Sequence, residues 1–183
     1  MNEYVVHRFE TKEGLPLWVR PLRPQDAPQL VHLFEHMGPE SRYLRFNVPL
    51  NNPDPQLVWQ EAHRLAQVNA GDGAWLVFAD LPEKGPVPVA GARFVRLASD
   101  PATAEASLAV RDDMQNRGIG TGLLRFLLEQ ARAAGIQRLQ ATVQRTNRPL
   151  WHLLRRAGLP LESQASGGTS TISVDLTAAE QAE

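Results

Sequence analysis

An apolar run, a glycine-rich turn and a long amphipathic helix follow one another over residues 108–134. The run is Leu108-Ala109-Val110, and the turn carries three glycines at alternate positions, Gly118, Gly120 and Gly122. From residue 119 onward, apolar residues recur at the spacing of a helix with one broad apolar face. This stretch constrains the fold most, because it joins the end of a strand to the start of a helix.

The start of this helix is suited to binding an anion. The first turn of any helix has backbone N–H groups without partners, and the helix dipole places partial positive charge there. Glycines let a bulky anion approach those groups closely. The sequence therefore predicts a phosphate or pyrophosphate ligand held mainly by main chain. From the glycines alone a second interpretation stays open, in which a tight turn packs the helix on a sheet and binds nothing.

Two known phosphate motifs do not match this turn. The Walker pattern needs Lys and then Ser or Thr after its last glycine, and here Leu123 and Leu124 follow Gly122. The dinucleotide fingerprint needs G-x-G-x-x-G and an acidic residue at the end of the next strand. The turn instead reads G-x-G-x-G, and residues 138–143 contain no acid.

A third motif does match. Residues 115–120 read Gln-Asn-Arg-Gly-Ile-Gly, which has the form Q/R-x-x-G-x-G/A and follows a strand. This resembles the acyl-CoA-binding motif of the GNAT superfamily of N-acetyltransferases. The resemblance implies that the turn binds the CoA pyrophosphate of acetyl-CoA and that the strand pairs with the pantetheine amides.

Asn147 matches an asparagine that touches the pantetheine arm in the family, and it is also placed to cap a helix. The residues implied to bind the cosubstrate are Leu108, Ala109, Val110, Gln115, Asn116, Arg117, Gly118, Ile119, Gly120, Thr121, Gly122 and Asn147.

The order of elements along the chain fits the same family. Periodicity and turn residues predict strand, two helices, three strands, helix, strand, helix, strand. The predicted strands cover residues 17–22, 74–79, 87–97, 103–110, 139–143 and 169–176, and N-caps are predicted at Asp26, Asp54 and Asn147. We therefore expect a single α/β (α+β) domain over residues 1–183. It should have a GNAT-like core at about 17–176, with a mixed, mostly antiparallel sheet flanked by helices.

Charge is balanced overall but uneven along the chain. The net charge of -1 gives no support for general nucleic-acid binding. Residues 111–160 nevertheless contain nine arginines against three acidic residues. A solvated surface is the ordinary interpretation of such arginines, but their position around a phosphate turn favours a role in holding the phosphates of CoA.

Several absences narrow the chemistry. The chain has no cysteine, which removes thiolate metal sites and cysteine nucleophiles and suits a reducing compartment. The five histidines have no metal-binding spacing, so no metal is expected. No signal peptide is apparent, and no apolar run approaches the roughly 20 residues that span a bilayer. The expected location is cytoplasmic, without membrane contact, and the sequence carries no signal for an oligomeric state.

The segment Pro39–Phe46 reads Pro-Glu-Ser-Arg-Tyr-Leu-Arg-Phe. It resembles the opening of bacterial GNAT protein acetyltransferases, including GNAT domains joined to acyl-CoA synthetase-like regions. The resemblance implies that the acceptor is a protein lysine, for example on a CoA-ligase-type enzyme. We expect the segment itself to form a helical turn that tucks Tyr43, Leu44 and Phe46 under the sheet.

Glu105 is the predicted catalytic residue. A lysine amine has a pKa of about 10.4, so acyl transfer at neutral pH requires a group that removes a proton. Alternation along the strand places Glu105 and Ser107 on one face. The resemblance assigns a general-base glutamate to this position. Taken without it, a solvated strand glutamate is the ordinary interpretation.

The expected reaction is direct transfer of an acetyl group to an amine, since no cysteine can carry a covalent intermediate. Leu154 stands where many GNAT enzymes have a tyrosine that protonates the CoA thiolate. A CoA thiol is a good leaving group, so the reaction can proceed without that donor. Two alternatives stay open: a small-molecule amine acetyltransferase, and a non-catalytic acyl-CoA-sensing module.

Overall fold

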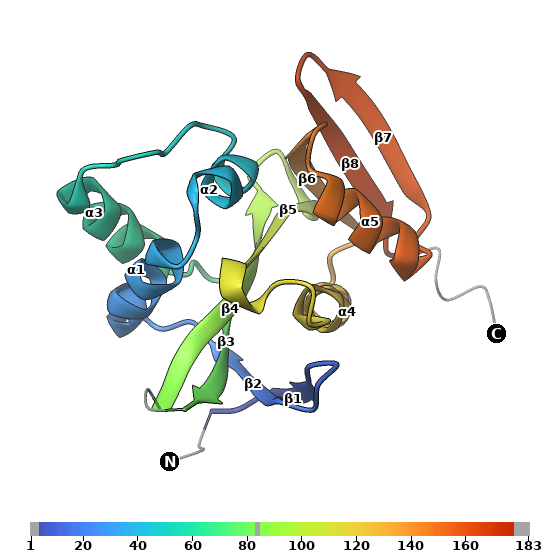
Figure 1. The fold of residues 1–183 in the computed structure, drawn as a ribbon. Coiled ribbons are helices and arrows are strands. Elements are labelled where there is room, and N and C mark those ends of the chain that lie inside the picture. The colour runs from blue at the N-terminus through green and yellow to red at the C-terminus, as the bar shows by residue number, and fades with distance from the viewer. Residues whose placement is uncertain (1–3, 83–84, 178–183) are drawn as a thin grey trace.

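A computed structural model describes residues 4–82 and 85–177 of the protein. Its strands form one sheet in the order β1-β2-β3-β4-β5-β6-β8-β7 (Figure 1). All neighbouring strands are antiparallel except β5 and β6, which confirms the predicted mixed, mostly antiparallel sheet. The strands are β1 His7–Glu10, β2 Pro16–Pro21, β3 Gly73–Leu81, β4 Gly85–Leu97, β5 Asp100–Val110, β6 Arg138–Gln144, β7 Leu161–Ser166 and β8 Thr169–Asp175.

Helices cover both faces of the sheet. The helices are α1 Ala27–Glu35, α2 Pro39–Phe46, α3 Pro55–Ala66, α4 Ile119–Ala133 and α5 Arg148–Ala157, with short 3-10 turns at Pro24–Asp26 and Asp112–Met114. On one face, Leu33 of α1 packs with Leu76 and Phe78 of β3. On the other face, the ring of Phe126 in α4 meets that of Trp75 edge-on. Because successive strand residues point to opposite faces, α1 and α4 lie on opposite sides of the sheet (Figure 1).

The sheet opens between β5 and β6. These strands pair only from Thr103↔Arg138 to Glu105↔Gln140. Beyond that point β5 continues along β4 as far as Val110, while β6 continues along β8. The two strands therefore diverge and leave a wedge in which the facing edges of β5 and β6 are unpaired.

Helix α2 covers part of this wedge. Asn47, which ends the helix in a left-handed conformation, donates a hydrogen bond to the carbonyl of Thr142 in β6 at 3.2 Å. Gln144 of β6 donates back to Asn47 Oδ1 at 3.1 Å. The expectation that this segment tucks its apolar residues under the sheet is wrong for Tyr43, which is exposed, because α2 spans the wedge instead of packing flat on the sheet.

Edge strands and one cap also differ from the sequence expectation. Strands β1 and β7 were not predicted; both lie at the edges of the sheet and are short. Asp54 and Asn147 cap α3 and α5 as predicted. Asp26 precedes α1 but makes no side-chain cap, since its carboxylate binds Arg20 at 2.6 and 2.8 Å. A buried ion pair thus takes the place of the predicted cap.

Candidate active site

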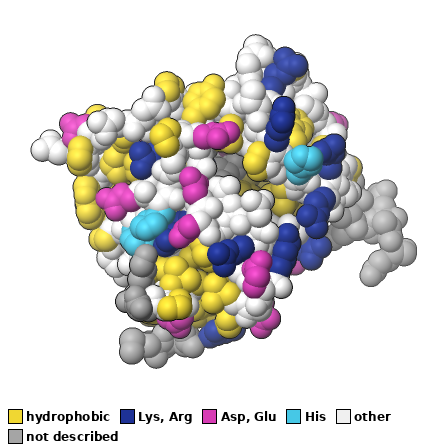
Figure 2. All heavy atoms as spheres, in the orientation of Figure 1, with side chains coloured by type: hydrophobic (Ala, Val, Ile, Leu, Met, Phe, Trp, Pro, Cys, Tyr) yellow, Lys and Arg dark blue, Asp and Glu magenta, His cyan; other side chains and the backbone are white. Residues whose placement is uncertain are grey.

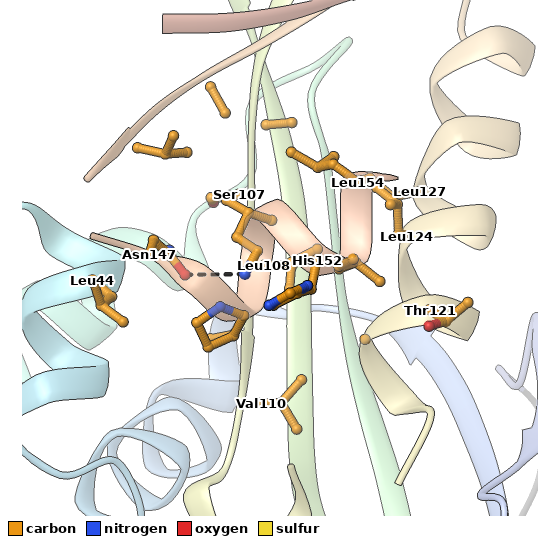
Figure 3. A pocket seen from close by; sticks show the side chains of 18 of the residues that line it. Leu44, Ser107, Leu108, Val110, Thr121, Leu124, Leu127, Asn147, His152 and Leu154 are labelled. Atoms are coloured by element: carbon orange, nitrogen blue, oxygen red, sulfur yellow. Dashed lines mark hydrogen bonds between the residues drawn. The ribbon is translucent and has the colours of Figure 1, made fainter. Parts of the chain in front are cut away.

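The wedge between β5 and β6 contains a cavity of about 650 Å³, here called the wedge cavity. Its walls come from residues 106–110 of β5, residues 139–143 of β6, the start of α4 and the inner side of α5. Figure 3 shows α5 crossing in front of β5, with Val110 visible below the helix. Because β5 has lost β6 as a partner here, backbone groups on that edge are free to pair with an extended ligand that carries amides.

The glycine turn at one end of the wedge cavity has the geometry of an anion site. Asn116 and Gly118 adopt left-handed backbone angles, with φ of 62° and 89°. The N–H groups of Thr121 and Gly122 bind the Gly118 carbonyl, both at 3.1 Å. The N–H groups of Ile119 and Gly120 in the same first turn have no intrahelical acceptor, and both residues line the cavity.

The last two glycines of the turn, Gly120 and Gly122, face different neighbours and have different structural roles. A Cβ added to Gly120 would lie 3.6 Å from Leu153, which is an ordinary contact. Protein packing therefore does not require a glycine at this position, and its small size leaves room for a ligand. A Cβ added to Gly122 would lie 2.7 Å from the ring of Phe9 in β1. Gly122 therefore lets β1 approach α4.

The turn is held in place by residues far away in the chain. Gln115 donates to the Val110 carbonyl at 3.3 Å, to Asp112 at 3.2 Å and to Ser41 at 3.3 Å. Its amide therefore ties the turn to β5 and α2. Lys12, from the loop between β1 and β2, donates through Nζ to the Asn116 carbonyl at 2.9 Å and lines the wedge cavity. No sequence pattern pointed to Lys12.

The basic residues divide into two groups. Arg111 is fully buried and bonds Asp113 at 2.9 and 2.7 Å, and its guanidinium holds the pKa of Asp113 below the usual value. Arg111 is therefore committed to the turn after β5, so the expectation that the whole arginine group serves CoA is too broad. Lys12, Arg148 and Arg156 line the wedge cavity. Figure 2 shows a hollow on this face with Lys and Arg side chains gathered along one side of it.

Helix α5 supplies the remaining wall of the wedge cavity. Asn147 lines the cavity and accepts a hydrogen bond from the Leu150 N–H at 3.1 Å (Figure 3). This bond uses the amide oxygen, so the amide NH₂ stays available to a ligand. Leu154 is buried in the cluster that contains Leu124 and Leu127 of α4. The position of the missing tyrosine is thus an apolar patch of the cavity wall.

A second cavity of about 400 Å³ lies on the opposite side of β5, beneath α1, α2 and α3. We call it the helix-side cavity. Most of its wall is apolar, but Arg45, Glu61 and Arg93 also line it. Four residues line both cavities, namely Met37, Arg45, Ser107 and Ala109. The two cavities therefore meet at the middle of β5.

Glu105 lies at the point where β5 leaves β6. It pairs with Val95 on one side and with Gln140 on the other. Its side chain is exposed and lies on the same strand face as Ser107, toward α2. It lines neither cavity, but its charge acts on Arg45. Burial and the charge of Arg93 lower the pKa of Arg45 to about 10, and Glu105 and Glu61 oppose this change.

Two further features bear on the predicted chemistry. Among residues 4–82 and 85–177, no cluster of His, Cys, Asp and Glu has the arrangement to hold a metal ion. Within the same ranges no helix is long and apolar enough to cross a membrane.

The comparisons with known proteins agree with this geometry. The model of the acetyltransferase (GNAT) family matches residues 40–159, more than half of the chain. The protein therefore belongs to the GNAT family of acetyltransferases, whose members use acetyl-CoA, and the predicted family and enzyme class are confirmed.

Individual relatives support the same assignment. Acetyltransferase Pat of Mycolicibacterium smegmatis is 30% identical over 149 residues, which are 81% of this chain and 43% of that protein. An L-methionine sulfoximine/L-methionine sulfone acetyltransferase of Pseudomonas aeruginosa is 39% identical over 62 residues, 34% of this chain and 36% of that protein. The matched segments thus cover less than half of the length of each of these relatives.

The fold also matches a solved structure. The GNAT domain of Streptomyces lividans PAT superimposes with a TM-score of 0.78 at 24% identity, covering 92% of this chain and 96% of that domain. The predicted fold class is therefore confirmed.

Proposed function

We propose that the protein transfers the acetyl group of acetyl-CoA to a primary amine that enters from the helix side of β5. The observation that carries this proposal is the meeting of the two cavities at Met37, Arg45, Ser107 and Ala109. A thioester in one cavity and an amine in the other would face each other there. Such proximity can supply a large part of the rate enhancement of a reaction between two substrates.

The cosubstrate would lie along the wedge cavity. Its pyrophosphate would accept hydrogen bonds from the N–H groups of Ile119 and Gly120 at the positive end of α4. The pantetheine arm would pair with the free edge of β5 at residues 108–110 and receive a bond from Asn147. This arrangement directs the thioester toward Ser107, where the cavities meet.

Glu105 would act as the general base. The amine nitrogen forms a bond to the thioester carbon and loses one proton, the carbon–sulfur bond breaks, and the CoA thiolate leaves. Glu105, directly or through a water molecule, takes the proton from the amine. Leu154 offers no donor to the thiolate, which takes its proton from solvent. The chain has no cysteine to form an acyl-enzyme, which favours direct attack.

A protein lysine is the first candidate acceptor. The resemblance of Pro39–Phe46 to protein acetyltransferases supports it, with a CoA-ligase-type enzyme as the partner. Exposed apolar side chains on α2, α3 and the loop between them could also contact a protein substrate; these are Tyr43, Val48, Leu57 and Trp59.

A small-molecule amine is the second candidate. It is favoured by the helix-side cavity, which is apolar and lies beneath three helices. It is also favoured by the similarity to an acetyltransferase named for the amino-acid derivatives L-methionine sulfoximine and L-methionine sulfone.

An acceptor screen tests the proposal. The protein is incubated with acetyl-CoA and either a panel of small amines or lysine-containing proteins, including an acyl-CoA synthetase, and products are identified by mass spectrometry. We expect acetylated amine and free CoA in equal amounts. Tight CoA binding without any acetylated acceptor would contradict the proposal and support the acyl-CoA-sensing alternative.

A further inference from the structure

We infer that Arg45 and Arg93 form an anion-binding site in the helix-side cavity that selects acceptors carrying a carboxylate close to the amine. The substrate class is then an α-amino acid or close analogue with an apolar side chain. This inference rests on the proposed function, because it takes the helix-side cavity as the acceptor site. It decides between the two candidate acceptors in favour of the small molecule.

Arg93 is held at the junction of the two cavities by strand pairing. It lies on β4 directly opposite Ser107 of β5, so both side chains point to the same face of the sheet. The Nε of Arg93 is buried, and no residue in the described part of the chain accepts its proton. A buried charged donor without an acceptor is costly. A ligand carboxylate would accept from the terminal nitrogens of Arg93, which, unlike Nε, are not fully buried unpaired atoms.

Arg45 reaches the same place from helix α2. It lines both cavities, and no acidic residue of the described chain forms an ion pair with Arg45 or Arg93. The lowered pKa of Arg45, about 10, still leaves it charged at neutral pH. Burial also lowers the pKa of Arg93. Two partly buried guanidinium groups of like charge would both be stabilised by one anion.

The acidic residues around this cavity already have partners. Glu61 binds Arg64 of the same helix at 2.7 and 2.5 Å. Asp54 caps α3, and Asp72 accepts from the backbone N–H of Arg96 at 2.9 Å. Glu105 is the proposed base. None of these carboxylates forms an ion pair with Arg45 or Arg93, so both guanidinium groups lack an anionic partner in the described part of the chain.

The rest of the cavity defines the body of the ligand. Its wall is made largely of apolar side chains, among them Leu30, Leu33, Phe34, Val58 and Leu65. A volume of about 400 Å³ lies near the small end of the roughly 300–1,000 Å³ range of ligand pockets. Directly opposite residues of antiparallel strands have Cα atoms about 4.5–5.5 Å apart. Arg93 and Ser107 are neighbours on one face of this strand pair, so a carboxylate bound by Arg93 and an amine near Ser107 would lie in the same part of the cavity.

Matched acceptors test the inference without any variant. Acetyl transfer from acetyl-CoA is measured with L-methionine and L-leucine, and with the corresponding amides L-methioninamide and L-leucinamide. The amine of the amide loses its proton more easily than that of the acid, so without an anion site the amide should be the better acceptor. We expect kcat/KM for the acids to exceed that for the amides by at least about tenfold, since a hydrogen bond to a charged group contributes about 1.5–3 kcal/mol.

A variant assigns the preference to the arginines. In Arg93→Gln the KM for L-methionine should rise at least about tenfold, whereas CoA affinity and kcat/KM for the amide should stay close to the wild-type values. Arg8→Gln, on the exposed surface of β1, is the matched control and should change none of these quantities. Calorimetry measures the affinity of the CoA-saturated protein for N-acetyl-L-methionine. This affinity should fall in Arg93→Gln and stay at the wild-type value in Arg8→Gln.

The outcomes separate the two proposals. Equal use of acids and amides, or an unchanged acid preference in a folded Arg93→Gln, would overturn the anion site and leave the acetyltransferase function intact. Acetylation of protein lysines with no activity on the amino acids would also overturn it. If no amine of any kind is acetylated although CoA binds, the proposed function fails first. Should Arg93→Gln not fold, the acid-to-amide comparison in the wild-type protein decides.

Discussion

The two cavities on either side of β5 are built in different ways. The wedge cavity depends on main chain: the N–H groups at the start of α4, the free edge of β5 and a turn with left-handed residues. The helix-side cavity depends on side chains that come from α1, α2, α3 and three strands. A main-chain site tolerates many sequences around a few glycines, whereas a side-chain site changes with every substitution. The comparison therefore predicts that the cosubstrate is the one common to the family, whereas the acceptor is specific to this protein.

The strongest test of the main-chain site is Gly120→Glu. It places a carboxylate at the position proposed for the pyrophosphate, so CoA affinity should fall roughly 100-fold or more through like-charge repulsion and loss of space. Calorimetry measures the affinity, and circular dichroism checks the fold. Gly120→Ala is the control, because its Cβ would make only an ordinary contact with Leu153. Unchanged affinity in the glutamate variant would refute the phosphate site.

The proposed general base, two residues before Ser107 on β5, is tested by Glu105→Gln. The amide keeps the size of the side chain but cannot take a proton, and general bases typically contribute roughly 10²–10⁴-fold in rate. Turnover at pH 7 should therefore fall at least about tenfold while CoA affinity stays the same. Part of the rate should return at high pH, where more of the amine is neutral.

Leu154→Tyr complements this test. It introduces a proton donor at the apolar wall where many relatives have one. If removal of the amine proton limits turnover, as the proposed role of Glu105 requires, this variant should be no faster than the wild-type protein. A clear increase in steady-state kcat would instead identify thiolate protonation as the slow step.

Gly122→Ala separates packing from binding within the same turn. The new methyl group would lie 2.7 Å from the ring of Phe9, and such overpacking typically costs about 1–3 kcal/mol of stability. Denaturant unfolding should show this loss, with little change in the CoA affinity of the folded protein. Adding Phe9→Leu should restore part of the stability. A large loss of CoA affinity at native stability would mean that Gly122 belongs to the ligand site.

The smallest expected effect concerns the exposed charges beside the wedge cavity. Arg148→Gln, or dephospho-CoA in place of CoA, should weaken binding roughly two- to fivefold, since exposed ion pairs contribute about 0.2–1 kcal/mol. Raising the salt concentration should have a similar effect, because screening acts within about 10 Å at 0.1 M. Arg125→Gln, an exposed residue of α4, is the control. Binding that does not respond to salt would leave the main chain as the whole source of affinity.

The sequence predicted what depends on local pattern. The strand, turn and helix at residues 108–134 and the caps at Asp54 and Asn147 follow from residues close together in the chain. The mostly antiparallel sheet was expected because the element order resembles that of the GNAT family. The sequence could not show the different roles of Gly120 and Gly122, since both belong to the same glycine-rich turn. Their difference depends on Leu153 and Phe9, which approach from α5 and β1.

By itself, then, the sequence predicted the family, the glycine turn and the order of the larger elements, because backbone preference and periodicity are local properties. The tertiary structure alone decided which charged side chains are buried, paired or exposed to a cavity. It buried Arg111 against Asp113, brought Lys12 to Asn116 across 104 residues, and placed Arg45 and Arg93 together in a cavity. The physical reason is that burial and pairing of side chains depend on contacts between distant segments, which no local pattern encodes.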